Sequence, residues 1–301
     1  MEKIAILIPV HNGIEFTRKC IPDLLKQTDD LKEKAIFIPV IIDDGSTDGT
    51  SEWLSEKYPE LHILKGDGSL WWSGSINAGI KHVMDNNLAD YILWWNNDIK
   101  PDDSYFKELV QILPGLSNTM VAGSKIYDEQ SGKIWGMGGK FDFKTGKKYQ
   151  VAYYVDDSDA YDKVVDVDWL PGMGTLAHVD IYKKTGLIDA VTFPQYHGDL
   201  EWTFKAKLSG YKVQVFPSLK IFNDTSNTGL KRKENWKDLK DSLTSIKSLY
   251  NYKKDIALYK KFTRTPWSYL FLLEKYSKFL GGFIKWKILG ILTQSKKGQE
   301  K

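Results

Sequence analysis

The stretch that decides the fold is Tyr91-Ile-Leu-Trp-Trp-Asn-Asn-Asp98, an apolar run that ends on two amides and a carboxylate. A buried strand of a parallel sheet is a short continuous hydrophobic run, and ligands of such sheets gather at the carboxyl ends of the strands. We therefore expect Asp98 to lie where a ligand binds. An Asx turn that closes the strand is the alternative, because polar residues also end strands as turn formers.

A second apolar run ends on carboxylates as well. Residues 36–42 lead directly into Asp43-Asp44-Gly45-Ser46-Thr47-Asp48-Gly49-Thr50. Two acidic strand ends predict a site for a divalent metal and a phosphate-bearing ligand, because hard cations prefer carboxylate and phosphate oxygens. The other interpretation is that Asp44, Ser46 and Asp48 cap the helix that follows.

Apolar runs alternate with amphipathic segments along the first part of the chain. We expect strands over residues 4–10, 35–42, 61–64, 91–95, 120–123 and 212–216. We expect helices over residues 16–25, 50–57, 75–86, 104–113 and 201–210. This alternation predicts an α/β fold with a mostly parallel central sheet flanked by helices on both faces. Residues 133–170 predict hairpins or an irregular antiparallel extension.

Length and composition limit the class of protein. A chain of 301 residues can bury the core of one large domain, alone or with an appendage. The single cysteine, Cys20, excludes a disulfide framework and a cysteine-based zinc site, and we expect it to pack as a small apolar side chain. The N-terminal apolar run is too short for a signal peptide, so we expect a cytoplasmic protein.

Charge divides the chain near Leu230. Residues 231–301 contain 18 Lys and Arg against 6 Asp and Glu, whereas residues 1–230 contain 24 against 33. We expect residues 231–301 to form a basic, amphipathic helical extension. Residues 265–292 mix aromatic and aliphatic clusters with lysines, and no uncharged run approaches the roughly 20 residues that span a bilayer. The extension then lies at an anionic membrane surface, or it packs on the preceding domain or on a second subunit of a homodimer.

Several blocks resemble, in order and spacing, the motifs of family 2 glycosyltransferases. They are Ile-Leu-Ile-Pro-Val-His-Asn (6–12), Ile-Ile-Asp-Asp-Gly-Ser-Thr-Asp-Gly-Thr (41–50), Ser-Ile-Asn-Ala-Gly-Ile (75–80), Leu-Trp-Trp-Asn-Asn-Asp (93–98) and His-Gly-Asp-Leu-Glu-Trp-Thr-Phe-Lys-Ala-Lys-Leu-Ser-Gly-Tyr (197–211). The resemblance implies the GT-A fold for residues 1–230, and inverting transfer of a sugar from a nucleotide diphosphate to a hydroxyl. The Asn-Asn-Asp ending and the segment from Leu70 to Gly79 look most like the rhamnosyltransferase-like branch.

The resemblance also implies a divalent metal, Mg²⁺ or Mn²⁺, at the diphosphate. Asp98 matches the last acid of the family's Asp-X-Asp element, whereas Asn96 replaces the first acid and leaves one charge fewer. Asn96 is then expected to bind the ribose or a metal-bound water. Many relatives carry a histidine near position 223 that reaches the metal or the diphosphate. This chain offers Asn223 and Asp224 as the remaining candidate ligands.

The nucleotide and the sugar are expected at the strand ends and at the segment 66–77. By resemblance, Asp43 or Asp44 accepts a hydrogen bond from N3–H of uracil or thymine, whereas His11 could equally be a loop residue bonded to backbone. Small residues at 73–75 are expected to leave a helix N-terminus free for the diphosphate. Of Trp71 and Trp72, we expect one to form an apolar wall against the sugar and one to pack in the core. The donor-binding candidates are Pro9, His11, Asn12, Asp43, Asp44, Ser46, Asp67, Trp71, Trp72, Asn77, Asn96 and Asn97.

Asp199 aligns with the carboxylate that the family uses to deprotonate the acceptor. We expect apolar surface from Trp202, Tyr196 and Phe193 to raise its pKa toward the working pH. Gly198 stands where an acid usually precedes the base, and Glu201 replaces an Asp. Glu201 is therefore the alternative base, or a residue that holds the acceptor or orients Asp199. The acceptor-binding candidates are Trp169, Gly172, Met173 and Trp202.

Other classes of protein fit less well. A nucleotide-sugar pyrophosphorylase typically has a glycine-rich, basic loop after its first strand, and a Rossmann dehydrogenase has G-x-G-x-x-G there; this chain has neither. A carbohydrate-binding protein without catalysis is the alternative that 11 Trp and 16 Tyr favour. The acidic residues 1–230 argue against nucleic-acid binding. The expected activity is transfer from dTDP-rhamnose or a UDP-hexose to a glycan or lipid-linked acceptor in cell-surface polysaccharide synthesis.

Overall fold

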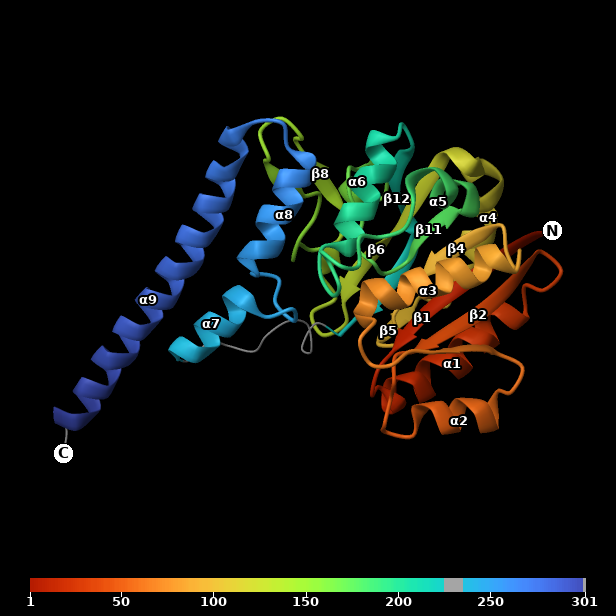
Figure 1. Ribbon diagram of the computed structural model, residues 1–301, viewed down its shortest axis with the longest axis horizontal. Coiled ribbons are helices and arrows are strands. Elements are labelled where there is room, and N and C mark those ends of the chain that lie inside the picture. The colour runs from red at the N-terminus through yellow and green to blue at the C-terminus, as the bar shows by residue number, and fades with distance from the viewer. Residues whose placement is uncertain (225–234, 300–301) are drawn as a thin grey trace. The chain divides into compact units, whose positions relative to one another are not determined.

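The computed structural model describes residues 1–224 and 235–299, and the chain divides into two compact units (Figure 1). Unit 1 comprises residues 1–140 and 149–227, and unit 2 comprises residues 141–148 and 228–301. The predicted boundary near Leu230 lies outside the described residues. The division adds one feature that composition does not reveal, because residues 141–148 belong with the C-terminal unit.

The N-terminal half of unit 1 is a parallel sheet with crossover helices. Strand β1 (Glu2–Val10) lies between β2 (Ala35–Asp43) and β4 (Tyr91–Trp94), and β3 (His62–Lys65) pairs with β2, all in parallel. The crossover helices are α1 (Ile14–Asp29), α2 (Thr50–Lys57), α3 (Trp71–Asp85) and α4 (Tyr105–Leu116). Helix α3 packs on β1 and β2 through Ile76, Ile80 and Val83, which lie on one face at helical spacing. The predicted strand and helix alternation is confirmed here.

The other half of the sheet is mixed. Strand β11 (Thr175–His178) runs antiparallel between β4 and β6 (Met120–Asp128), and β12 (Lys212–Asn223) is parallel to β6. Helices α5 (Val179–Thr185) and α6 (Gly198–Leu208) connect β11 to β12. The remaining strands are β5 (Ile99–Pro101) and β10 (Val165–Asp166) beside β12, β7 (Ile134–Gly136) beside β6, and the separate pair β8 (Gly139–Phe141) and β9 (Lys148–Gln150). Of these strands, β7, β8, β9 and β10 lie in the extension predicted over residues 133–170, whereas β5 precedes it.

The core of unit 1 forms on both faces of this sheet. Alternate residues of a strand point to opposite faces, so Leu93 and Trp95 pack in one buried cluster and Ile92 and Trp94 in the other. Full burial of an aliphatic or aromatic side chain of this size contributes about 1.5–3 kcal/mol. Cys20 lies in the first cluster, as predicted, and burial raises the pKa of its thiol to about 12.

Unit 2 contains α7 (Trp236–Thr244), α8 (Tyr252–Phe262), a 3₁₀ turn (Pro266–Ser268) and α9 (Tyr269–Gln299). Asn235 and Asp238 form a capping box at the start of α7, and Asn251 caps α8. The Tyr259 hydroxyl donates to the Gly146 carbonyl at 2.8 Å, which attaches residues 141–148 to α8. Within the described residues, no helix combines the length and the apolar character needed to cross a bilayer.

Candidate active site

The loop after β2 is held by its own carboxylates. The Asp43 carboxylate accepts hydrogen bonds from the Ser46 amide at 3.0 Å and from the Ser51 hydroxyl. The Asp44 carboxylate accepts from the amides of Gly68 and Trp71, at 2.8 and 2.9 Å. Both side chains are buried. That Asp43 or Asp44 accepts a hydrogen bond from the nucleotide base stays a prediction. Such a bond would use a further lone pair of these carboxylate oxygens.

The ends of β1 and β2 are joined through His11 and Asn12. His11 Nδ1 lies 2.6 Å from the Asp44 carbonyl, and Asn12 Nδ2 lies 3.1 Å from His11 Nε2. These contacts assign the proton of a neutral ring to Nδ1. The Asn12 amide donates to the Ser46 hydroxyl, and Pro9 pairs with Ile42 at the sheet edge. His11 is thus bonded to backbone, as one of its two interpretations predicted.

The helix-capping interpretation of the loop 43–50 is confirmed for one residue. Asp48 accepts hydrogen bonds from the Thr50 amide at the start of α2 and from the Ile14 amide at the start of α1. Asp44 bonds to the segment 66–71 instead. Within that segment Asp67 is exposed, and its hydrogen bonds from Ser69 lower the pKa of its carboxyl.

The predicted free helix N-terminus for a diphosphate is wrong. Helix α3 begins at Trp71 rather than near Ser75, and its first amides already have acceptors. The Trp71 amide donates to Asp44, the Trp72 amide to the Gln195 side chain at 3.2 Å, and the Ser73 amide to the Pro194 carbonyl at 2.8 Å. A helix N-terminus binds an anion through unsatisfied N–H groups, so this one is occupied by the protein itself.

A continuous set of contacts joins β4, α3 and α6. Trp72 Nε1 donates to the Asn96 side-chain oxygen at 3.0 Å, and the edge of its ring lies against Trp94. The Trp72 ring also covers Gly172, where a Cβ would come within 2.3 Å of it. The Gly172 amide donates to the Asp199 carboxylate at 3.0 Å. The candidate base therefore lies beside the end of β4, although the two are separated by a hundred residues of sequence.

Asp199 occupies the first turn of α6 and is partly exposed. Its second carboxylate oxygen accepts from the Leu200 amide at 2.9 Å. Position 198, directly before Asp199, requires a glycine for steric reasons, because a Cβ there would lie 2.1 Å from the Ser73 hydroxyl. The departure from the family pattern at this position thus follows from close packing of α6 on α3.

The position of Trp202 contradicts its predicted role as an acceptor-binding residue. Trp202 is fully buried, donates from its indole nitrogen to the Gly186 carbonyl at 3.0 Å, and stacks on Tyr182. Trp202 therefore cannot contact an acceptor, because its ring belongs to the core. Trp169 and Met173 retain little exposed surface, and their acceptor contact stays a prediction.

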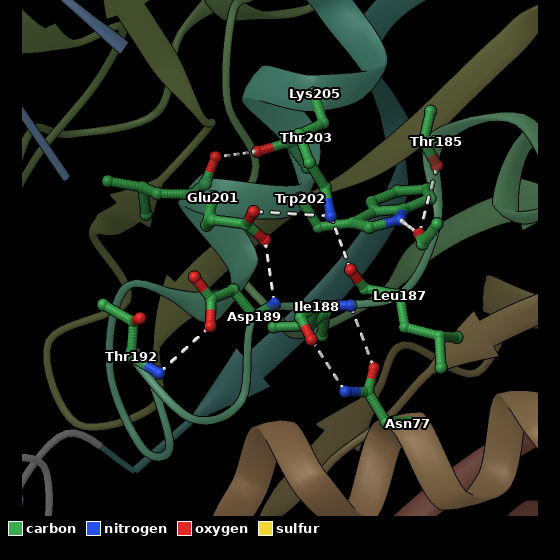
Figure 2. A network of polar contacts seen from close by, with 12 residues as sticks. Asn77, Thr185, Leu187, Ile188, Asp189, Thr192, Glu201, Trp202, Thr203 and Lys205 are labelled. Carbon is green, nitrogen blue, oxygen red and sulfur yellow. Dashed lines mark hydrogen bonds and ion pairs between the residues drawn. The ribbon is translucent and has the colours of Figure 1, made fainter. Parts of the chain in front are cut away.

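Glu201 is also misassigned as a base or acceptor ligand. Its carboxylate is fully buried, accepts from the Asp189 amide at 3.2 Å, and lies 3.3 Å from Lys205 Nζ (Figure 2). Asn77 holds the same segment from α3: its side-chain nitrogen donates to the Ile188 carbonyl at 2.8 Å, and its oxygen accepts from the Ile188 amide at 3.0 Å. Together these side chains fix the segment 187–189, which precedes the turn that carries Asp199.

The predicted metal ligands meet at the edge of the sheet. Asn223, the last residue of β12, pairs with Ile99 in β5, which brings Asp224 near Asp98. Desolvation raises the pKa of the Asp98 carboxyl, and the charge of Asp224 raises it further. The two carboxylates line a cavity of about 360 Å³ together with Glu129, Lys19 and Lys100.

This donor set fits a hard cation that completes its coordination elsewhere. In the part of the chain that the structure describes, no group of three or more His, Cys, Asp or Glu is arranged to hold a metal by itself. Mg²⁺ commonly takes one or two carboxylates and fills its other positions with phosphate oxygens and water. Asn97, the second polar residue after β4, also lines this cavity, and its side-chain nitrogen donates to the Thr17 hydroxyl at 3.0 Å.

Comparison with known proteins identifies the family. The model of glycosyl transferase family 2 matches residues 5–166, which is more than half of the chain. The chain belongs to glycosyl transferase family 2. An uncharacterised glycosyltransferase of Rickettsia typhi is 26% identical over 320 residues, which cover 98% of this family 2 chain and 91% of the relative. Glycosyltransferase AglE of Haloferax volcanii is 23% identical over 70% of the chain and 63% of its own length.

A solved structure supports the fold of this family 2 protein. The crystal structure of GalNAc-T7 with UDP, GalNAc and Mn²⁺ matches with a TM-score of 0.58 at 13% identity, over 85% of this chain and 50% of that one. The predicted α/β GT-A fold is thereby confirmed, and the chain is a glycosyltransferase by family.

Sequence reasoning missed several residues that shape the site. Gln195 and Pro194 accept hydrogen bonds from the first amides of α3, and Glu129 lines the cavity beside Asp98. None of them stands in a recognisable motif. Their roles depend on contacts between segments that lie far apart in the chain.

Proposed function

We propose that this family 2 protein is an inverting, metal-dependent glycosyltransferase of the rhamnosyltransferase-like branch. Its donor would be dTDP-rhamnose or a UDP-hexose, and its acceptor a glycan or lipid-linked hydroxyl in cell-surface polysaccharide synthesis. The observation that carries this proposal is the series of contacts Asn96–Trp72–Gly172–Asp199, which joins a strand-end amide, an aromatic wall and a partly exposed carboxylate.

Asp199 is the proposed general base. Inversion requires a group that removes the acceptor proton on the face opposite the leaving diphosphate. The amides of Gly172 and Leu200 each donate to one carboxylate oxygen of Asp199 and fix its orientation. With Glu201 fully buried, Asp199 is the acid in this segment that an acceptor can reach.

Asp98 and Asp224 are the proposed metal ligands, with Asn223 beside them. A bound Mg²⁺ or Mn²⁺ would neutralise the charge that develops on the leaving diphosphate. The structure of GalNAc-T7 with UDP and Mn²⁺ supports this assignment, as does the effect of Asp224 on the pKa of Asp98. Two carboxylates that each disfavour the other's charge gain stabilisation from a shared cation.

The donor nucleotide is proposed to lie over the ends of β1 and β2. Asp43 and Asp44 lie at this edge with His11 and Asn12, and Trp72 faces the neighbouring space beside Asn96. Thymine and uracil both present N3–H, which is why both donors are proposed. Trp72 is the better candidate for a sugar wall, because Trp71 has a backbone φ of 56° and its amide donates a hydrogen bond to the Asp44 carboxylate.

A screen of nucleotide sugars tests the proposal. Purified protein is incubated with dTDP- and UDP-sugars with Mg²⁺, with Mn²⁺ or with chelator, and release of the nucleotide diphosphate is measured. We expect slow, metal-dependent hydrolysis of at least one donor, which Asp98→Asn abolishes. Binding of a sugar without turnover of any donor would instead favour the non-catalytic alternative, which the family membership does not favour.

We further propose that the enzyme works in the cytoplasm at the inner face of a membrane. A lipid-linked acceptor requires the enzyme to reach a bilayer surface. The basic composition of residues 231–301 supports this location, because anionic lipids attract clustered lysines.

A further inference from the structure

Helix α9 exposes apolar side chains that its own unit does not cover. Leu270, Leu273, Leu280, Ile284 and Ile288 recur at helical spacing and form one stripe along the helix, here called the apolar stripe. Leu273 is 64% exposed and Ile284 is 50% exposed. Contiguous exposed apolar surface of this kind marks an interaction site.

The other side of α9 already has its partners. Leu272 and Phe283 are buried, Phe283 packs edge-on against Trp236, and Phe279 stacks on Tyr250. The buried carboxylate of Asp255 in α8 binds Lys275 of α9. One face of α9 thus packs within unit 2, and the apolar stripe lies outside that packed face.

Aromatic and basic residues accompany the stripe. Trp267, in the 3₁₀ turn before α9, is 74% exposed. Lys278 and Lys285 are exposed on the same helix. Trp is enriched where a membrane meets water, and exposed lysines are attracted to anionic headgroups.

We infer that the apolar stripe, with Trp267, is a docking surface for an anionic lipid membrane. Charge decides between a membrane and a second copy of the chain. Residues 231–301 carry three times as many basic as acidic residues, so two copies that paired through α9 would bring like charges together, whereas an anionic bilayer complements them. This inference deepens the proposed function by naming the surface through which the enzyme would meet a lipid-linked acceptor.

Vesicle sedimentation of the full chain tests the inference. We expect the protein to pellet with phosphatidylcholine vesicles that contain phosphatidylglycerol, to release at high salt, and to stay in the supernatant with phosphatidylcholine alone. The tryptophan emission should shift to the blue on binding and be quenched by brominated lipid. No sugar donor or acceptor is needed, so failure here leaves the glycosyl-transfer proposal intact, and failure of that proposal leaves this one intact.

Variants separate the apolar and the electrostatic contributions. Leu273→Asp with Ile284→Asp should weaken binding to anionic vesicles at least about tenfold, and Lys285→Gln should weaken it about fivefold. Leu208→Asp is the matched control, because Leu208 is an exposed leucine of α6 in unit 1 and should bind like wild type. Unchanged circular dichroism shows that the variants fold.

Two results would overturn the inference. The first is wild-type protein that stays in the supernatant with anionic vesicles at low salt. The second is a lipid-free dimer, measured by light scattering, that the Leu273→Asp and Ile284→Asp variant converts to monomer, since the stripe would then join two copies of the chain.

Discussion

Gly172→Ala should disable the active site through one added methyl group. An Ala Cβ at position 172 would lie 2.3 Å from Cζ2 and 2.7 Å from Cη2 of the Trp72 ring, whereas ordinary contacts lie at 3.4–4 Å. Gly172 does not have a positive φ, so the backbone accepts alanine and the effect is purely steric. The ring must therefore move by about 1 Å, or the loop that carries position 172 must move away from Asp199.

The magnitude follows from the contacts that this movement breaks. Overpacking of a buried contact costs about 1–3 kcal/mol, and loss of the Trp72–Asn96 hydrogen bond would add about 1 kcal/mol. A displacement of about 1 Å at a reacting group lowers the rate about 10²-fold. We expect kcat for transfer to fall by that factor, the melting temperature to fall by several degrees, and affinity for the nucleotide diphosphate to stay within about threefold.

The assay is release of nucleotide diphosphate from the donor identified in the screen, alongside thermal unfolding and calorimetric titration with the nucleotide. Gly115→Ala is the matched control, because a Cβ there meets nothing within 4 Å, and alanine in the helix should be neutral or slightly stabilising. Trp72→Phe in the Gly172→Ala background should restore part of the stability by removing the clashing ring edge. Wild-type stability and kcat in Gly172→Ala would refute the reasoning.

Three further predictions concern single side chains. Asp199→Asn should lower transfer by about 10²–10⁴ and leave donor binding intact, and near wild-type transfer would remove it as the base. Asp98→Asn should abolish Mn²⁺-dependent binding of nucleotide diphosphate in calorimetry. The folded protein raises the pKa of the Asp98 carboxyl, so ionisation of Asp98 lowers the free energy of unfolding as pH rises through the folded pKa. At pH 7 without metal, Asp98→Asn should therefore melt no lower than wild type. A lower melting temperature would contradict the assignment of Asp98 as a metal ligand. Asn77→Asp removes the side-chain N–H that donates to the Ile188 carbonyl, so it should lower kcat and speed hydrogen exchange of the amides in residues 186–192. Weaker nucleotide binding at unchanged kcat would instead show that Asn77 binds the nucleotide sugar.

The local hydrophobic pattern of the sequence was sufficient to predict the strands whose ends form the candidate active site. Apolar runs predicted β1, β2 and β4, and their polar ends predicted where Asp98 and the pair Asp43-Asp44 would lie. This success has a physical basis, because a buried strand must be apolar along its length and its carboxyl end is the first place where polar groups can leave the core. Strand β11 escaped prediction because its place between β4 and β6 is set by pairing alone.

The tertiary structure decided which of the candidate site residues are accessible to a ligand. Glu201 and Trp202 lie in the same motif as Asp199, but the orientation of α6 turns them into the core while Asp199 remains partly exposed. The start of α3 looked open in sequence, yet Asp44, Gln195 and Pro194 occupy its amides. The sequence by itself determined the α/β order through its periodicity and the basic C-terminal segment through its composition, and its motifs carried the resemblance to the family. These patterns could not determine burial or hydrogen-bond partners at these positions, because both depend on segments that meet only when the chain has folded.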